Sequence, residues 1–154
     1  MSVIGVRRAT AADVDLLVDL MREFYAEAGF TLDEAWAASA FARLLDDSSL
    51  GAAWIMSVDG ESAGHAVLTV RFAMEFGGLS GYIDDLFVRT RHRRRGAAQA
   101  GLEALVAECR TRGCQSLHVE VDPGNVAAVA FYQRFGLKPG DDTRSHLKAI
   151  LHKP

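Results

Sequence analysis

A basic turn followed by a glycine is the feature of this sequence with the clearest chemical use. Residues 82–88 are β-branched and aromatic with two acids, the basic run 91–95 follows, and Gly96 precedes an alanine-rich segment. This order predicts a strand, a loop and the start of a helix. The first N–H groups of a helix lack partners and lie at the positive end of its dipole, and a glycine lets an anion approach the backbone. The junction therefore predicts a phosphate-binding site.

The basic run 91–95 has two other interpretations, a solvated surface turn or a nucleic-acid contact. The formal net charge of the chain is −3, whereas nucleic-acid binders usually carry a larger basic footprint. Aromatic residues are not interleaved with the arginines, as binding to a single strand would require. We therefore expect the phosphate of a coenzyme and no nucleic-acid partner.

The spacing within the loop matches a known family. The pattern Arg93-x-x-Gly96-x-Ala98 resembles the Q/R-x-x-G-x-G/A motif of the GNAT superfamily of N-acetyltransferases. The resemblance extends over about residues 81–139 and includes, in order, a strand, the loop, a helix, a strand, an asparagine and a tyrosine. The family usually has a proline where Thr90 stands, and Ala98 takes the place of the last motif glycine.

The resemblance implies acetyl-CoA as the co-substrate, with its pyrophosphate in the loop. The implied coenzyme-binding residues are Phe87, Val88, Arg93, Arg94, Arg95, Gly96, Ala97, Ala98, Asn125 and Tyr132. The Val88 N–H is the expected oxyanion donor. Tyr132 matches the tyrosine that protonates the departing thiolate, which a phenol with its usual pKa of about 10 can do; the alternative is an aromatic packing residue. Asn125 is either a helix N-cap or a coenzyme contact.

Two adjacent acids, Asp84 and Asp85, interrupt the apolar strand. Buried carboxylates are unfavourable unless they face solvent, a partner or a ligand. Strand alternation sends the two side chains to opposite faces unless a bulge intervenes. An amine must lose a proton before it attacks a thioester, so we expect Asp84 to take that proton through water and Asp85 either to bind substrate charge or to have a structural role. The alternative is that one of them pairs with an arginine.

The acceptor pocket is expected among the first two helices and the strands before residue 80. Phe24, Tyr25 and Glu27 are the candidate substrate-binding residues, and Asp33, Trp36 and Glu75 could also contribute. Acidity there suits a cationic amine, although amphipathic helices explain most of these residues equally well. His65 is interpreted as a packed or exposed histidine. Cys109 and Cys114 make no metal-ligand pattern, so no metal is expected.

Periodicity, turn residues and capping positions predict the elements that carry these residues. Strands are expected at 3–8, 51–58, 62–72, 79–88, 116–121 and 145–151, and helices at 11–27, from 31 to about 45, between Gly96 and Gly113, and at 126–135. The order predicts an α/β fold with helices on both faces of a mixed sheet. The resemblance implies a mainly antiparallel central sheet of six to seven strands, about four helices, and a splayed central strand pair.

Length and composition agree with a single domain. The chain has 154 residues, 49% of them hydrophobic, which fits one domain with a core, and the resemblance implies one GNAT-like acetyltransferase domain over residues 1–154. No apolar stretch approaches the roughly 20 residues of a membrane span, and the N-terminus lacks the apolar region of a signal peptide. We expect a cytoplasmic protein with no membrane partner and, as is common in the family, a homodimer.

The leading functional hypothesis is an N-acetyltransferase that moves an acetyl group from acetyl-CoA to a primary amine by direct attack in a ternary complex. The acceptor is a small polyamine-like amine, an amino acid or a protein amine. A non-catalytic acyl-CoA-binding sensor or regulatory module is the alternative, and a nucleic-acid-binding protein is disfavoured by the net charge.

Overall fold

A mixed five-stranded sheet is the framework of the computed structural model, which describes residues 1–140 and 144–152. The strands are β1 (Ile4–Arg8), β2 (Gly51–Val58), β3 (Glu61–Ala73), β4 (Gly78–Val88) and β5 (Ser116–Val119). They lie in the order β1-β2-β3-β4-β5; the first three pairs are antiparallel and β4 pairs with β5 in parallel. The parallel pair needs a crossover, and a helix after β4 provides it.

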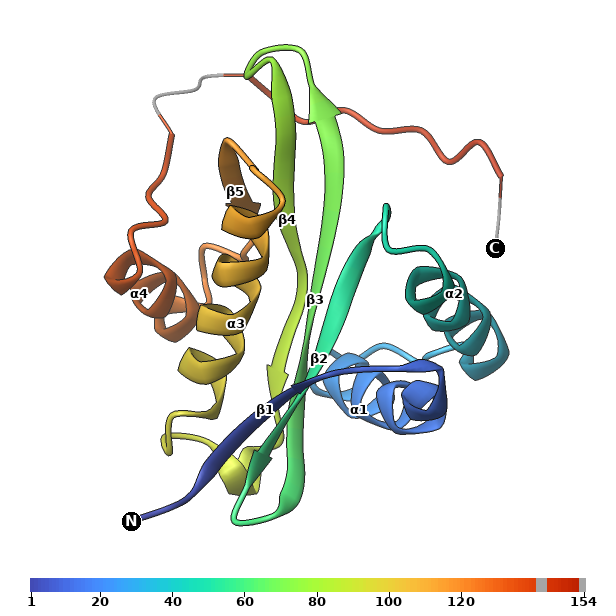
Figure 1. Ribbon diagram of the computed structural model, residues 1–154, viewed down its shortest axis with the longest axis vertical. Helices are drawn as coiled ribbons and strands as arrows, with labels where there is room; N and C mark the ends of the chain where they lie inside the picture. Colours follow the sequence, from blue (N-terminus) through green and yellow to red (C-terminus); the bar gives the residue numbers. More distant parts are fainter. Residues whose placement is uncertain (141–143, 153–154) are drawn as a thin grey trace. The chain divides into compact units, whose positions relative to one another are not determined.

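Helices cover both faces of this sheet (Figure 1). The α-helices are α1 (Val14–Glu27), α2 (Glu34–Asp46), α3 (Ala97–Thr111) and α4 (Val126–Arg134), and short 3-10 turns occur at Ala11–Asp13 and Thr90–His92. α3 packs on one face, so closely that a Cβ at Gly101 would lie 2.8 Å from the Met56 sulfur. α1 and α2 cover the other face, where Leu17, Leu20 and Phe41 are buried against β2 and β3.

The chain divides into two compact units, Met1–Glu120 and Val121–Pro154. The first holds the sheet with α1, α2 and α3. The second holds α4, whose first turn is capped by the Asn125 side chain, which accepts a hydrogen bond from the Ala128 N–H at 3.2 Å. Gly136, at φ +87°, follows the end of α4.

The expected sheet of six to seven strands is wrong, because the described residues form five. Residues 145–151 are described and contain no strand. Their apolar residues do not alternate as a half-buried strand requires, and Leu147, Ile150 and Leu151 are exposed. The strand expected at 116–121 ends at Val119. Four α-helices agree with the expected number, and none in the described part of the chain is long and apolar enough to cross a membrane.

β4 changes its partners and its register along its length. β5 pairs only with Ser80–Ile83, so on that edge no described strand of the first unit pairs with residues 84–88. On the other edge the register with β3 shifts: Val67 lies opposite Asp85, whereas Leu68 lies opposite Ile83. Asp84 is therefore the extra residue of a β-bulge, which re-aims the side chains that follow it.

Candidate functional site

The loop after β4 leads directly into the N-terminus of α3. Gly96 is the N-cap residue and has φ +98°, a left-handed conformation that favours glycine. The first hydrogen bond of α3 runs from the Ala100 N–H to the Gly96 carbonyl at 3.0 Å. The N–H groups of residues 97–99 consequently have no partner within the helix. Arg94 adds a second left-handed residue, at φ +62°, and such successions of N–H groups form anion-binding concavities.

The arginines of the loop face different directions. The Arg93 guanidinium turns back onto the protein, donating from Nε to the Val88 carbonyl at 2.8 Å and from Nη2 to Glu27 at 2.5 Å. Arg89, just before the loop, is held by Glu23 at 2.8 Å. Arg94 and Arg95 are exposed, and the contact of Arg95 with a carboxylate is long, at 3.9 Å. The first pair thus fixes the loop, whereas the second pair leaves positive charge available to an anion.

Val88 ends β4 with its polar backbone groups directed away from β3. The Arg89 N–H donates to the Ala63 carbonyl at 2.7 Å, so the next pair, Val88 opposite Gly64, occupies a non-hydrogen-bonded position of the antiparallel ladder. The Val88 carbonyl accepts its hydrogen bond from Arg93 in the following loop. The Val88 N–H faces the edge that β5 leaves unpaired.

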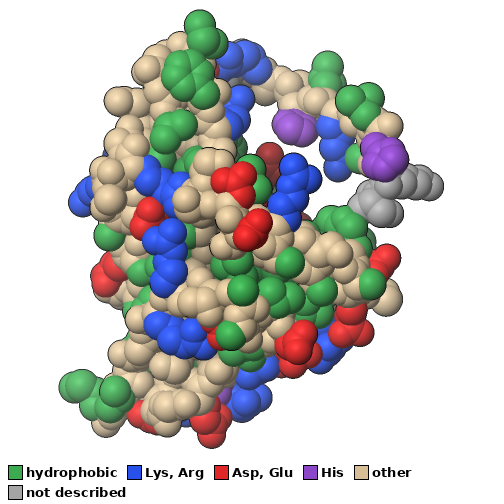
Figure 2. Space-filling view, turned by 45° about the vertical axis from the view of Figure 1, so that its right-hand side comes forward, with side chains coloured by type: hydrophobic (Ala, Val, Ile, Leu, Met, Phe, Trp, Pro, Cys, Tyr) green, Lys and Arg blue, Asp and Glu red, His purple; other side chains and the backbone are tan. Residues whose placement is uncertain are grey.

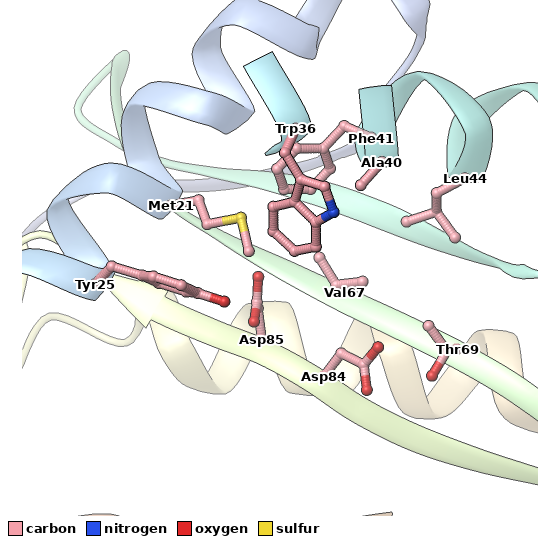
Figure 3. A pocket seen from close by; sticks show the side chains of 10 residues that line it. All are labelled: Met21, Tyr25, Trp36, Ala40, Phe41, Leu44, Val67, Thr69, Asp84 and Asp85. Carbon is pink, nitrogen blue, oxygen red and sulfur yellow. The ribbon is translucent and has the colours of Figure 1, made fainter. Parts of the chain in front are cut away.

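A cavity of about 380 Å³ lies on the face of the sheet covered by α1 and α2. Its lining residues come from four elements, α1, α2, β3 and β4: Met21, Tyr25, Trp36, Ala40, Phe41, Leu44, Val67, Thr69, Asp84 and Asp85. Figure 3 shows the Trp36 ring from α2 on one side and the two carboxylates from β4 on the other. On the molecular face drawn in Figure 2, hydrophobic side chains gather near the middle, with acidic and basic side chains around them.

Both carboxylates line this one cavity because of the β-bulge at Asp84. The expectation of opposite faces is therefore overturned by the bulge. In a regular strand Asp85 would point to the face of Gly81, which packs against Cys109 of α3. The bulge avoids burying a carboxylate under that helix, which would be costly. It turns Asp85, and after it Phe87, toward α1.

A fully buried histidine holds Asp85. His65 Nε2 lies 3.1 Å from Asp85 Oδ2. The imidazole is surrounded by the rings of Phe24, Phe41 and Phe87, at centroid distances of 6.1 to 6.4 Å. No described residue offers a hydrogen bond to His65 Nδ1. The only polar partner that the described residues give this ring is therefore the Asp85 carboxylate, whose orientation it fixes.

Burial and neighbouring charges raise the pKa of two groups of the cavity, Asp84 and Tyr25. Asp84 is exposed when the whole residue is considered. Partial burial of its carboxyl group nevertheless raises the pKa of Asp84 above the usual range. The Asp85 charge adds to this rise, and a hydrogen bond with Thr69 opposes it. The pKa of Tyr25 is also raised, first by burial and then by the charges of Asp85 and Asp84. A cation bound here would offset the repulsion between the two carboxylates.

The residues expected from the sequence fall into three places. Tyr25 and Asp85 lie in the cavity with Asp84, whereas Phe24 stacks on Phe87 at 5.3 Å and Glu27 binds Arg93, so neither lines it. Phe87, Val88 and residues 93–98 lie at the end of β4 and the start of α3. Asn125 and Tyr132 belong to the second unit, where the Tyr132 ring packs edge-on against Phe131 at 5.3 Å.

Apart from Trp36, the apolar lining of the cavity was not expected from the sequence. Trp36, Ala40 and Leu44 recur every four residues along one face of α2, the same spacing as a helix face packed in the core. Val67 and Thr69 belong to β3, where residues 63–68 are all buried, so burial alone does not mark Val67 as part of a cavity wall. The residue types alone do not separate a cavity wall from a core face, because the difference is whether another element covers them.

Comparison with known proteins places the fold and the loop in one family. A family model described as the Acetyltransferase (GNAT) family matches residues 14–137. An integron cassette protein from the mobile metagenome of Cole Harbour Salt Marsh is 40% identical, with a TM-score of 0.85 over 97% of this chain and 91% of that one. No curated protein matches significantly.

Two solved structures of lower identity share the fold. One is a predicted acetyltransferase with acetyl-CoA from Clostridium acetobutylicum, 19% identical, with a TM-score of 0.78 over 95% of this chain and 96% of that one. The other is the aminoglycoside N-acetyltransferase AAC(6')-Iy in complex with CoA, 17% identical, with a TM-score of 0.81 over 97% of each chain. Because the family model spans most of the sequence, from α1 through the glycine loop to the end of α4, this protein belongs to the GNAT family of acetyltransferases.

Proposed function

We propose that this protein is an acetyl-CoA-dependent N-acetyltransferase whose amine acceptor binds in the cavity of Asp84 and Asp85. The observation that carries the proposal is the β-bulge that brings both carboxylates into one cavity with aromatic walls. Paired carboxylates attract an ammonium ion, and one of them with a raised pKa can act as a base. Membership in the GNAT family supports acetyl transfer as the reaction.

The loop fits the phosphates of the co-substrate. Unpartnered N–H groups at the start of α3, the left-handed Gly96 and the exposed Arg94 and Arg95 together provide donors and positive charge. The relatives solved with acetyl-CoA or CoA support the same co-substrate here. Acetyl-CoA would supply the acetyl group as a reactive thioester. Phe87, Val88, Arg93, Ala97, Ala98 and Asn125 remain the other proposed contacts.

Asp84 would act as the base, directly or through water. The amine enters as an ammonium ion, and Asp85, held by His65, binds that charge. Loss of one proton toward Asp84 frees the nitrogen lone pair to attack the acetyl carbon. A nitrogen–carbon bond forms and the carbon–sulfur bond breaks, giving the amide and coenzyme A. The ammonium ion loses two protons in all. One ends on the sulfur of coenzyme A, and the other passes to solvent.

Val88 and Tyr132 would stabilise the remaining charges. The Val88 N–H lies on the unpaired edge of β4 and would donate to the carbonyl oxygen as it becomes negative. Tyr132 would donate a proton to the departing sulfur, the role implied by its match to the family tyrosine. Neither role involves an acetylated enzyme.

The experiment is thiol release from acetyl-CoA in the presence of polyamines, amino acids, aminoglycosides and lysine peptides. Turnover with at least one class, and product acetylated on nitrogen, would establish the enzyme. Tyr132→Phe should then slow turnover while leaving acetyl-CoA binding nearly unchanged, because it removes a proton donor used after binding. Equal loss of both would identify Tyr132 as a packing residue. Tight acetyl-CoA binding without turnover on any acceptor would instead favour a sensor.

A further inference from the structure

The acceptor cavity has an apolar wall and an acidic end. Six of its ten lining side chains are apolar: Met21, Trp36, Ala40, Phe41, Leu44 and Val67. In Figure 3 the two carboxylates of β4 lie below Trp36, with the Tyr25 hydroxyl toward Asp85 and Thr69 beside Asp84. A ligand that satisfies both regions carries its positive charge at one end and an apolar body at the other.

Among the described residues, none of those that line the cavity is a cation. Its ten lining residues include two aspartates and no lysine, arginine or histidine. Arg71 lies two positions beyond Thr69 in β3, but its guanidinium covers the Tyr82 ring at 5.4 Å and donates to the Tyr82 hydroxyl at 3.2 Å. A carboxylate on the acceptor would therefore meet two negative charges and no partner, which is an effective way to reject a ligand.

The Asp85 side chain and the backbone of Trp36 are held in place before a ligand arrives. Asp85 is held by the buried His65. Trp36 stands in the first turn of α2, where the Asp33 side chain accepts a hydrogen bond from its backbone N–H at 3.1 Å. Fixed groups lose little entropy on binding, so they discriminate well among ligands of similar size.

The size of the cavity limits the apolar body. Its volume of about 380 Å³ is near the lower end of the roughly 300–1,000 Å³ of ligand pockets in proteins. A single ring on a short chain fits within such a space. Neither a three-ring aminoglycoside nor a polyamine matches it, because each would place additional cations against the apolar wall.

We propose that the acceptor is a compact primary amine with an apolar, ring-sized body and no carboxylate, of which an arylalkylamine is the simplest example. The inference rests on the acetyl transfer proposed above, and the same bonds form and break. Trp36, Leu44 and Val67 contact the apolar body, and Asp84 and Asp85 face the ammonium group.

The test compares amines that differ by one feature. Phenethylamine is the reference, phenylalanine adds a carboxylate, putrescine replaces the ring by a second cation, and an N-acetyl-lysine amide presents a protein amine. With saturating acetyl-CoA we expect kcat/KM for phenethylamine to exceed each of the others by at least about tenfold, since a missing apolar contact or an unpaired charge costs that much or more. A higher kcat/KM for phenylalanine, putrescine or the lysine amide would overturn the inference and leave the acetyltransferase intact.

Two variants locate the discrimination. Trp36→Ala should lower kcat/KM for phenethylamine about tenfold and change it little for methylamine, which has no body to contact the ring. Phe72→Ala, which removes an exposed aromatic residue of β3 outside the cavity, is the matched control and should change neither. Equal effects of Trp36→Ala and Phe72→Ala on phenethylamine would count against the assigned contact.

Direct binding separates this inference from the proposed function. Calorimetric titration of phenethylamine into the protein without acetyl-CoA needs no turnover. Binding that is weakened by Trp36→Ala, together with an absence of acetylation, would contradict the transferase and support the ligand class. An absence of phenethylamine binding in a protein that acetylates another amine would contradict the ligand class alone.

Discussion

Asp84 and Asp85 are chemically unequal although they are neighbours in one cavity. Asp85 has a buried partner in His65 at 3.1 Å, whereas partial burial and the Asp85 charge raise the pKa of Asp84. A carboxyl group with a raised pKa is a better base, and a carboxylate held by a donor is a better permanent charge. The assigned roles follow from this difference.

The first prediction concerns the pH dependence of the reaction. Asp84 must be ionised to accept a proton, so activity falls as the pH drops through its raised pKa. Asp85→Asn removes the neighbouring charge that raises this pKa, so the acid limb of log kcat/KM against pH should move to lower pH. Asp15→Asn, at an exposed position of α1, is the control and should leave the limb in place. A limb that stays or moves upward in Asp85→Asn would contradict Asp84 as the base.

The second prediction concerns His65. His65→Phe fills the aromatic enclosure but removes the donor to Asp85, whereas His65→Gln keeps a donor near the position of Nε2. A hydrogen bond to a charged group contributes about 1.5–3 kcal/mol, so we expect KM for the amine to rise about tenfold or more in His65→Phe and to recover largely in His65→Gln. KM for acetyl-CoA should remain unchanged. A parallel rise of both KM values, or equal damage in the two variants, would indicate a purely structural histidine.

At the scale of elements, the loop between β4 and α3 depends on backbone conformation at Gly96. Gly96→Ala forces a side chain into φ +98°, which costs about 1 kcal/mol and shifts the N–H groups that follow. We expect weaker acetyl-CoA binding, measured by calorimetry, and a lower free energy of unfolding. Gly113→Ala, at φ +74° beyond the other end of α3, imposes similar strain away from the loop. It should lower stability alone; weakened coenzyme binding there would contradict the local role of Gly96.

The elements with local signals were predictable from the sequence. β2 begins and ends as predicted, and the Asp59-Gly60 turn has the two positive φ angles of a tight hairpin, 51° and 84°. The N-cap of α4 at Asn125 was also predicted and is confirmed. Each of these follows from a few neighbouring residues, so no knowledge of the tertiary structure is needed.

The elements that depend on distant partners were not predictable. The bulge at Asp84 depends on which face of β4 meets α3. The sequence Asp84-Asp85 alone does not show whether the strand is bulged. A strand was expected at 145–151 because the segment contains several apolar residues, although they do not alternate with polar ones as in a strand. The cavity wall of α2 has the spacing of a core helix. Only the folded arrangement decides these cases.

At the scale of the whole molecule, the buried Cys109 thiol is a poor nucleophile, which agrees with the direct transfer proposed above. Burial raises the pKa of the Cys109 thiol to about 12, with a contribution from Cys114, so little of it is thiolate at neutral pH. We expect both substrates to bind before either product leaves. Double-reciprocal plots should intersect, and Cys109→Ser with Cys114→Ser should retain activity. Parallel plots, or an acetylated enzyme detected by mass spectrometry, would contradict direct transfer.

The most direct test of the central claim is acetylation of phenethylamine by the wild-type protein and by Asp84→Asn, with saturating acetyl-CoA and the amide product quantified by mass spectrometry. Loss of a general base lowers turnover by roughly 10²–10⁴-fold, and we predict a loss in that range with acetyl-CoA binding unchanged. Similar rates of amide formation in the two proteins would contradict the assignment of Asp84 as the catalytic base of this acetyltransferase.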